Sequence, residues 1–377
     1  MIVSGLSGNE LYCLAKKGLA PGAILVGNSV YSLGALRGFT SGMRTLAGGE
    51  IQSLSELISD GRHAAIRRLE EEAQTAKASG ATGVTSQLTR VGGMHEFLAV
   101  GSTVHGVDAK APFFTTACSG QDLYCQIDAG YSPRHFVIGN VAFAMGVGRG
   151  LTGALRAMAG GEVKEYSDMY NHTRHLALQR LEAEAASRGA NAVVDVTTRI
   201  MSFGSGVKEM LMVGTASHNP ALGAAPIPAT SELTGEELWN LTQLGYAPVR
   251  LLLGSSVYSL GFSGGIKAFF SSLSRGEVTS MTRLVYEARE NCLAHIHREA
   301  AELNIEAVIG VKIFINELSS GLVEVLAIGT GMRKHNGVAT QSEALLPQAI
   351  IRDRDTFFDE TVGATAQLAR TESRGAT

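Results

Sequence analysis

The chain lacks the features that would place it in several large classes of protein. No apolar run reaches about 18 uncharged residues, so no membrane-spanning helix is predicted. The first residues have neither a basic nor an apolar signal region, and we expect a cytoplasmic protein. Four cysteines in 377 residues form no C-x-x-C pair, which argues against a disulfide framework. A net charge of −3 gives no basic footprint, so we expect no nucleic-acid partner.

Charge is also scarce. Only 18% of the residues are Asp, Glu, Lys or Arg, below the usual quarter, while 45% are hydrophobic. A chain of this kind has a well-filled core and less solvated surface than an ordinary monomer needs. We therefore expect part of the surface to be buried against other subunits.

What the sequence does contain is a unit that occurs three times. Its marker glycines, Gly27, Gly139 and Gly254, lie 112 and 115 residues apart, and three Gly-Glu pairs keep the same spacings. Such a period indicates a tandem triplication. The boundaries we predict are residues 5–106, 116–219 and 231–334, followed by a tail at 335–377 that has no fourth copy.

Each unit shows the same order of predicted elements. A capped helical arm comes first, then a buried strand around the marker glycine, a glycine-rich short helix such as Gly34–Glu50, a long amphipathic helix and a β-hairpin. The marker glycine predicts a bulge or a close backbone approach. Glu50 and Gly80 are 30 residues apart, whereas Glu162 and Gly189 are 27 apart, which predicts a three-residue insertion near the end of the first long helix.

These patterns resemble the YbjQ-like family, whose domain is labelled heavy-metal-binding. The resemblance rests on G-N/S-S-V-Y in the strand, the G-G-E ending, G-A-N-A-V-V at Gly189–Val194 and V-G-T-A at Val213–Ala216, and it covers nearly all of residues 5–333. It implies an α+β fold of three tandem dodecin-like β-α-β-β domains that form an oligomeric ring or barrel. It also implies pentamers, and hence a homo-oligomer whose chain number is a multiple of five.

A ring also follows from physical reasoning. A unit of about 80 residues with an open sheet edge buries too little surface alone and leaves backbone groups unpaired. Edge-to-edge closure removes both faults. We expect residues 363–377 to be disordered and the segment around residues 345–358 to dock on a partner.

Metal binding would require His, Cys or carboxylate groups that converge. Cys13 and Cys125 hold the same place in two arms, and His63 and His175 match on two long helices. Neither pair has a counterpart in the third unit. These four residues are our candidate ligands for a heavy-metal ion, and the alternative is that they are buried thiols and interface histidines.

Polar residues that recur in all three units form a second candidate set. Either they line a pore or small-molecule pocket, or they form Arg–carboxylate pairs at subunit contacts. The set comprises Glu50, Glu162 and Glu277; Arg62, Arg174 and Arg289; and Glu96, Glu209 and Glu324.

No catalytic constellation accompanies them. One G-x-G-x-x-G run at Gly148–Gly153 is not repeated and lacks the acidic residue that a dinucleotide site requires. We therefore favour a non-enzymatic, self-assembling ring- or shell-forming protein with a structural or sequestering role. The alternatives are a protein that binds heavy-metal ions at inter-subunit axes and an enzyme that acts on a small molecule at inter-domain pockets.

Overall fold

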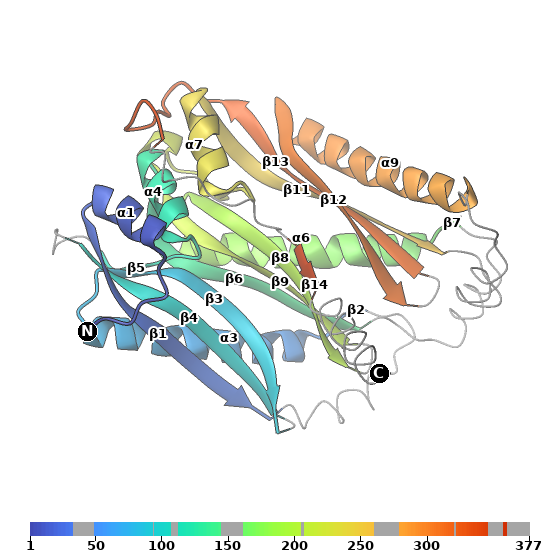
Figure 1. The fold of residues 1–377 in the computed structure, drawn as a ribbon. Helices are drawn as coiled ribbons and strands as arrows, with labels where there is room; N and C mark the ends of the chain where they lie inside the picture. Colours follow the sequence, from blue (N-terminus) through green and yellow to red (C-terminus); the bar gives the residue numbers. More distant parts are fainter. Residues whose placement is uncertain are drawn as a thin grey trace, which may run out of the picture.

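The computed structural model describes residues 1–32, 49–92, 94–106, 112–144, 161–204, 207–259, 279–319, 322–345 and 357–359. It is an α+β fold in which three repeats share one plan, and their sheets follow one another from lower left to upper right in Figure 1. The first repeat contains α1 (Gly8–Lys16), β1 (Leu19–Tyr31), β2 (Gly49–Glu50), α3 (Gln52–Thr75), β3 (Gly80–Val91) and β4 (Met94–Gly106). The second contains β5 (Phe114–Thr115), α4 (Gly120–Asp128), β6 (Ser132–Ala144), β7 (Gly161–Glu162), α6 (Lys164–Ser187), β8 (Ala192–Gly204) and β9 (Val207–His218). The third contains η1 (Pro220–Leu222), β10 (Ala229–Thr230), α7 (Gly235–Gln243), β11 (Tyr246–Ser259), α9 (Thr279–Glu302), β12 (Ala307–Ser319) and β13 (Leu322–Lys334).

In each repeat the last strand lies in the middle of the sheet. β4 pairs antiparallel with β1 and β3, β9 with β6 and β8, and β13 with β11 and β12. The hairpin signals in the sequence predict the pairing of the last two strands, because a tight turn joins adjacent antiparallel strands. The first strand then joins the free edge of the hairpin.

The marker glycines lie where the long helix touches the sheet. A Cβ atom at Gly27 would come within 2.1 Å of the Ala65 carbonyl oxygen, and one at Gly139 within 2.0 Å of the Ala177 oxygen. The same geometry holds for Gly254 and Cys292, at 2.2 Å. Only glycine permits this approach, so the predicted close backbone contact is confirmed.

Short strands cross from one repeat to the next. β2 of the first repeat pairs with β6 of the second, and β7 of the second pairs with β11 of the third. In the opposite direction, β5 pairs with β3 and β10 pairs with β8. Each internal junction is therefore held by strands exchanged in both directions.

The predicted insertion is wrong. All three long helices have 24 residues, and the left-handed residue that follows each is Lys77, Gly189 or Asn304. Gly80 is thus not the counterpart of Gly189, because a lysine with φ of 53° occupies the C-terminal turn of the first repeat. The predicted short helix, including most of Gly34–Glu50, lies outside the described residues.

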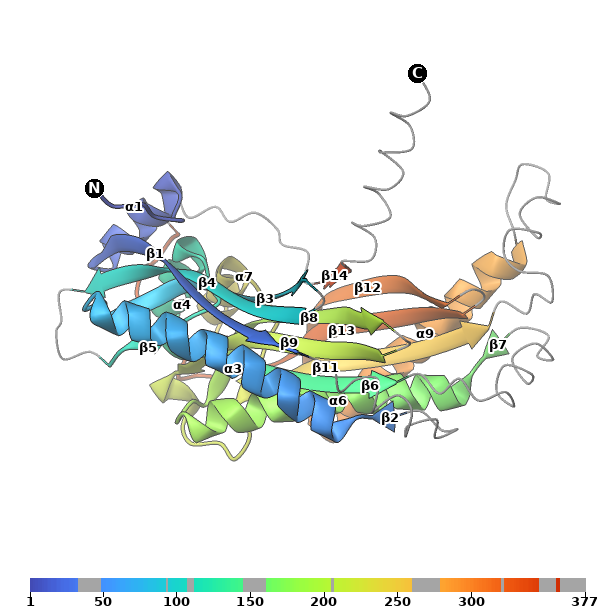
Figure 2. The ribbon, with the colours of Figure 1, turned by 90° about the horizontal axis from the view of Figure 1, so that it is seen from below.

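The arms α1, α4 and α7 gather at one end of the molecule in both views (Figures 1 and 2). In the tail, residues 335–345 run back over the arms, where Ser342 Oγ donates to Asp128 Oδ1 at 2.8 Å. β14 (Phe357–Asp359) pairs in parallel with β8 of the same chain, so this part of the predicted docking segment contacts its own second repeat. Residues 363–377 are not described. Among the helices that the structure does describe, none is long and apolar enough to cross a membrane.

Candidate functional site

The junctions between repeats hold most of the recurrent polar residues. At the first junction α3 lies between its own sheet and β6 of the second repeat, and at the second junction α6 lies between its own sheet and β11. One apolar core joins α3 to Phe136, Ile138 and Leu211 of the second repeat. A second core joins α6 to Leu251, Leu253 and Leu326 of the third. The first and second repeats thus complete their helix packing with the sheet of the next repeat.

Arg62 lies at the centre of the first junction. From α3 its Nε donates to Oε1 of Glu209 at 2.9 Å and its Nη2 to Oε2 at 2.7 Å. Nη1 donates to Ser86 Oγ at 2.9 Å. Both members of the ion pair are fully buried. The forked geometry matches guanidinium to carboxylate, and it fixes the register of the two repeats.

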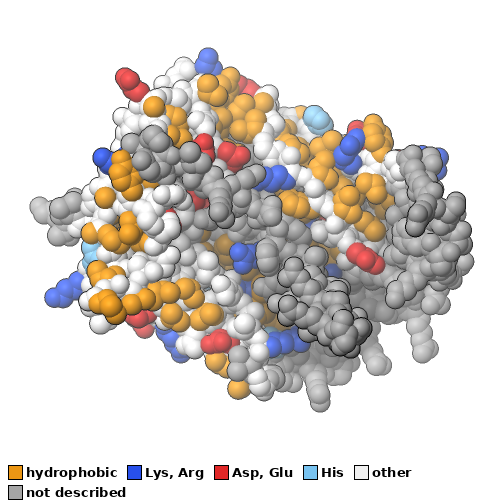
Figure 3. Space-filling model, in the orientation of Figure 1, with side chains coloured by type: hydrophobic (Ala, Val, Ile, Leu, Met, Phe, Trp, Pro, Cys, Tyr) orange, Lys and Arg blue, Asp and Glu red, His pale blue; other side chains and the backbone are white. Residues whose placement is uncertain are grey.

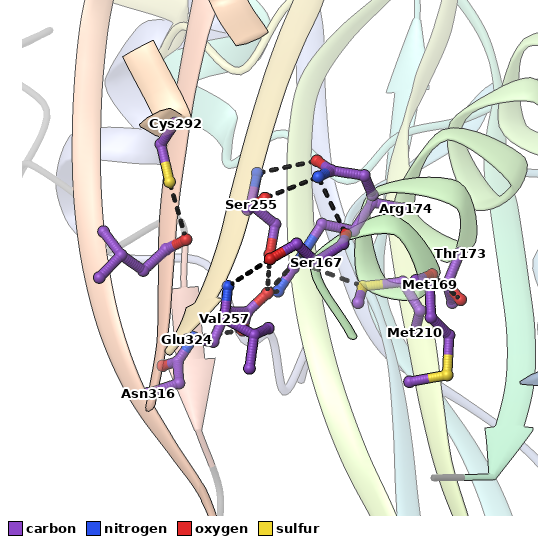
Figure 4. A network of polar contacts seen from close by, with 12 residues as sticks. Ser167, Met169, Thr173, Arg174, Met210, Ser255, Val257, Cys292, Asn316 and Glu324 are labelled. Atoms are coloured by element: carbon purple, nitrogen blue, oxygen red, sulfur yellow. Dashed lines mark hydrogen bonds and ion pairs between the residues drawn. The ribbon is translucent and has the colours of Figure 1, made fainter. Parts of the chain in front are cut away.

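Arg174 and Glu324 form the corresponding ion pair at the second junction, where two guanidinium nitrogens contact one carboxylate oxygen (Figure 4). Nε and Nη2 of Arg174 donate to Glu324 Oε1 at 3.2 and 2.7 Å, and both side chains are fully buried. Ser255 Oγ donates to Oε1 at 2.7 Å and Asn316 Nδ2 donates to Oε2 at 3.0 Å. The carboxylate therefore has donors on both oxygens, as a buried charge requires.

Of the three arginines and the three glutamates of the last strands, Arg289 and Glu96 remain, and the structure does not bring them together. Arg289 on α9 is 41% exposed at its side chain, stacks on Tyr286 and contacts Glu290 at 3.3 Å. Glu96 on β4 accepts hydrogen bonds from Asn28 and Thr89. They belong to the third and first repeats, at the two ends of the repeat array that the structure describes.

Glu50 and Glu162 lie in the crossing strands and contact the following repeat. Glu50 forms an ion pair with Arg180 of the second repeat at 2.7 Å. Glu162 accepts hydrogen bonds from Ser256 Oγ at 2.9 Å and from Asn291 of the third repeat. Glu277 lies outside the described residues. The geometry supports contacts between repeats, rather than a pore, as the function of these residues.

His63 and His175 also lie at junctions. His63 Nε2 is 3.0 Å from Glu184 across the first junction, and His175 Nε2 is 3.4 Å from Glu299 across the second. The hydrogen bond to the glutamate raises the pKa of each histidine, although burial opposes it. A hollow of about 540 Å³ next to His63 is lined also by Arg180.

The candidate cysteines are not brought into a metal site. Cys13 and Cys125 are buried among the arms with Trp239 and Leu238. Burial raises the pKa of both thiols, which disfavours the thiolate that a soft metal needs. Within the described part of the chain, no three His, Cys, Asp or Glu side chains converge on a point. Metal binding through these four residues stays a prediction.

Sequence reasoning missed a contact between arms. The Gly120 N–H of α4 donates to Glu10 of α1 at 3.0 Å, and the Gly235 N–H of α7 donates to Asp122 of α4 at 3.0 Å. The signal was present, because Gly120 and Gly235 follow the N-cap residue in arms that also have an acidic residue three positions after the cap. A Cβ at Gly235 would lie 2.6 Å from Asp122, so the glycine permits the arms to touch.

Asp128 was missed as well. It forms an ion pair with Lys17 at 2.5 Å and accepts a hydrogen bond from Trp239 Nε1 at 2.7 Å, so it ties three arms together. Burial alone would raise its pKa, but hydrogen bonds from Lys17, Trp239 and Ser342 outweigh this effect and lower the pKa below the ordinary value.

Comparisons with known proteins agree with this architecture. A profile of the family described as "Putative heavy-metal-binding" (YbjQ_1) matches residues 21–106, 132–219 and 246–334. An encapsulin nanocompartment protein of Mycobacterium tuberculosis is 32% identical over 239 residues, which cover 60% of this chain and 89% of that protein. The UPF0145 protein of Methanoregula boonei is 42% identical over 91 residues, or 24% of this chain and 76% of that protein. The UPF0145 protein of Vibrio campbellii is 39% identical over 80 residues, or 21% and 77%. No solved structure matches the chain.

Proposed function

This chain belongs to the YbjQ-like family and contains three tandem copies of the family's domain. We propose that it is a self-assembling structural protein that builds a shell or ring. The observation that carries the proposal is the similarity to a nanocompartment protein, of which the chain covers 89%. We propose no enzymatic activity, because the recurrent polar residues at the two internal junctions are used in contacts between repeats.

The packing of the repeats supports this proposal. The core around α3 is completed by the second repeat and the core around α6 by the third. Among the residues that the structure describes, the core around α9 consists of residues of its own repeat, such as Cys292, Ile296 and Leu252. The third repeat is therefore less completely covered than the first two, which favours association with more repeats.

A heavy-metal-binding function has weaker support. The arm cysteines are buried and their thiols are held protonated, and the interface histidines are hydrogen-bonded to glutamates. A sequestering role for the assembly does not depend on these residues. Pentameric units, a partner for the tail and a cytoplasmic location are further parts of the proposal.

Native mass spectrometry on protein purified without chelator tests the proposal, because it reports subunit number and bound mass together. We expect a homo-oligomer without a stoichiometric metal adduct. A monomer at all concentrations would contradict the assembly function, and one metal ion per chain would favour the binding function instead. Exchange of Cys13 and Cys125 for Ser would then show whether the thiols hold that metal.

A further inference from the structure

The first repeat has an apolar face that its counterparts bury. Four side chains on this face of β1 and β4 are between 42% and 51% exposed, and hydrophobic side chains gather over this sheet in Figure 3. At the same positions in the second and third repeats, every side chain is at most 7% exposed because α3 or α6 of the preceding repeat covers it. The exposed set is Ile24, Val26, Val30 and Met94; the buried sets are Phe136, Ile138, Ala142 and Val207, and Leu251, Leu253, Val257 and Leu322. We call the exposed set on the first repeat the receiving face. It differs from its two counterparts because no helix of a preceding repeat packs on it in the described part of the chain.

The third repeat has the complementary surface, because its long helix α9 is not covered by the sheet of a following repeat in the described part of the chain. On α9, a hollow of about 440 Å³ is lined by Thr282, Val285, Tyr286 and Arg289. The residues of α3 and α6 that correspond to Val285 are Ile58 and Tyr170, and both are fully buried. On β12, Val311, Ile313 and Ile315 are 41% to 57% exposed. We call the exposed residues of α9 and β12 the donor face.

The charged residues on the receiving face and on the donor face are also complementary. Glu96 is held by Asn28 and Thr89, which are the counterparts of Ser255 and Asn316 around Glu324. What Glu96 lacks is the arginine of a preceding repeat. Nε of Arg289 is buried without a hydrogen-bond partner in the described part of the chain, whereas Nε of Arg62 and Arg174 bonds a glutamate of the next repeat.

The arms show a third match. Gly120 and Gly235 donate their N–H groups to the acidic residue of the preceding arm. Gly8 is their counterpart in α1, and a Cβ placed there would meet no described atom within 4 Å. Glu237 of α7 is the counterpart of Glu10 and Asp122, and among the described residues no further arm follows α7.

We propose that copies of this chain join head to tail through a junction that reproduces the two internal ones. The donor face of one copy covers the receiving face of the next, Arg289 pairs with Glu96, and the Gly8 N–H donates to Glu237. This inference rests on the proposed function and specifies its chain-to-chain contact. The two faces differ, so the contact is heterologous and forms a ring where the rotation closes. A ring closed in this way by whole chains contains a multiple of three repeats.

One position differs from the internal junctions. Where His63 meets Glu184 and His175 meets Glu299, the chain-to-chain junction would place Glu290 opposite Glu72, the counterparts of those residues. Two carboxylates facing each other are unfavourable. The junction between chains is therefore weaker than the junctions within a chain.

Charge exchange tests the proposal. The variants are Arg289→Glu, Glu96→Arg and the double variant, compared with the natural chain by size-exclusion chromatography with light scattering across a concentration series. We expect each single variant to weaken association at least about tenfold, because like charges then face each other, and the double variant to recover it. Both residues are solvent-accessible within one chain, so circular dichroism should show that all variants remain folded.

The matched control is Arg283→Glu on the same helix. Arg283 is 78% exposed, and its counterparts Glu56 and Asp168 remain exposed at the internal junctions, so association should not change. Val26→Ser gives an independent test of the receiving face and should also weaken association. Single charge variants that associate like the natural chain would overturn the head-to-tail contact and leave the assembly function standing. A natural chain that is monomeric throughout would overturn both.

Discussion

Arg174 and Arg289 occupy the same position on two long helices, yet their surroundings are opposite. Arg174 is fully buried and donates twice to Glu324, whereas Arg289 is 41% exposed and has no glutamate of a following repeat. The two helices have the same length and pack on their own sheets in the same way. The difference shows that the next repeat, and not the repeat itself, completes the environment of this arginine.

The same comparison applies to the glutamates. Glu209 and Glu324 are fully buried, and Glu96 has two of the three kinds of partner that Glu324 has. The three repeats therefore form two finished junctions, in which helix, sheet and ion pair are all present. The first and third repeats each present one of the two surfaces of an unfinished junction. Substitutions at finished and unfinished junctions should differ in effect, and we expect the largest loss where a buried charge is left without its partner.

Replacing Arg174 by Ala should destabilise the chain by about 3–5 kcal/mol, because Glu324 is left as an uncompensated buried charge. The same replacement at Arg289 should cost about 1 kcal/mol or less in the dilute, unassembled chain, since this side chain is partly solvated. Urea unfolding followed by circular dichroism measures both values.

The pair Arg174→Met with Glu324→Leu is the control for this experiment. It removes both charges, and we expect it to recover most of the lost stability. Equal costs for Arg174→Ala and Arg289→Ala would contradict the distinction between finished and unfinished junctions.

Replacing Gly139 by Ala should cost about 1–3 kcal/mol, because the new methyl group overlaps the backbone of α6 and the helix must move. This contact lies within a repeat, so Gly27→Ala and Gly254→Ala should cost similar amounts whether or not a neighbouring repeat is present. Thermal unfolding measures the effect. Gly106→Ala is the control, since its nearest side-chain atoms lie at 3.4 Å, and a similar loss there would refute the close-approach explanation.

Replacing Glu290 by His should strengthen association between chains a few-fold. The new histidine would face Glu72, as His63 faces Glu184, and exchange a repulsion for an attraction. Light scattering across a concentration series at pH 6 measures the change. Glu287→His, at another exposed position of α9, should have no effect, and unchanged association of the Glu290 variant would argue against the proposed register of the junction.

The internal junctions should weaken slightly as the pH rises. The pKa values of His63 and His175 are raised in the folded chain, so their contribution is complete below pH 6.5 and is lost as the pH rises through the folded pKa. Burial raises the pKa of Glu182 to about 7, which acts in the same direction at the second junction. We expect less than about 1 kcal/mol from each histidine because solvent screens the pairs.

Unfolding free energies at pH 6 and pH 8 check this expectation. The double variant His63→Gln with His175→Gln should show a smaller loss between the two pH values than the natural chain. An unchanged pH dependence in that variant would assign the effect to other groups.

Much of the fold could be predicted because the same pattern of elements occurs three times in the sequence. The arms, the strand around each marker glycine and the closing hairpin are present in the structure. The helix end was placed wrongly in the first repeat, because Lys77 adopts the left-handed conformation that the sequence pattern assigns to glycine. Conformation at such a turn depends on local hydrogen bonds that composition does not reveal.

The site was predicted in part. The arginines and glutamates were identified as a set, but their partners could not be assigned, because a pair within one repeat and a pair across two repeats have the same periodicity. The contacts of Gly120, Gly235 and Asp128 depend on how arms stack in space, which linear spacing does not show.

Electron cryomicroscopy of the purified assembly tests the central claim most directly, because it shows which surfaces of neighbouring chains meet. We expect α9 of one chain to cover the receiving face of the next, with Arg289 hydrogen-bonded to Glu96 as Arg174 is to Glu324. Chains that meet through any other surface, with Ile24, Val26 and Arg289 still exposed to solvent, would contradict it.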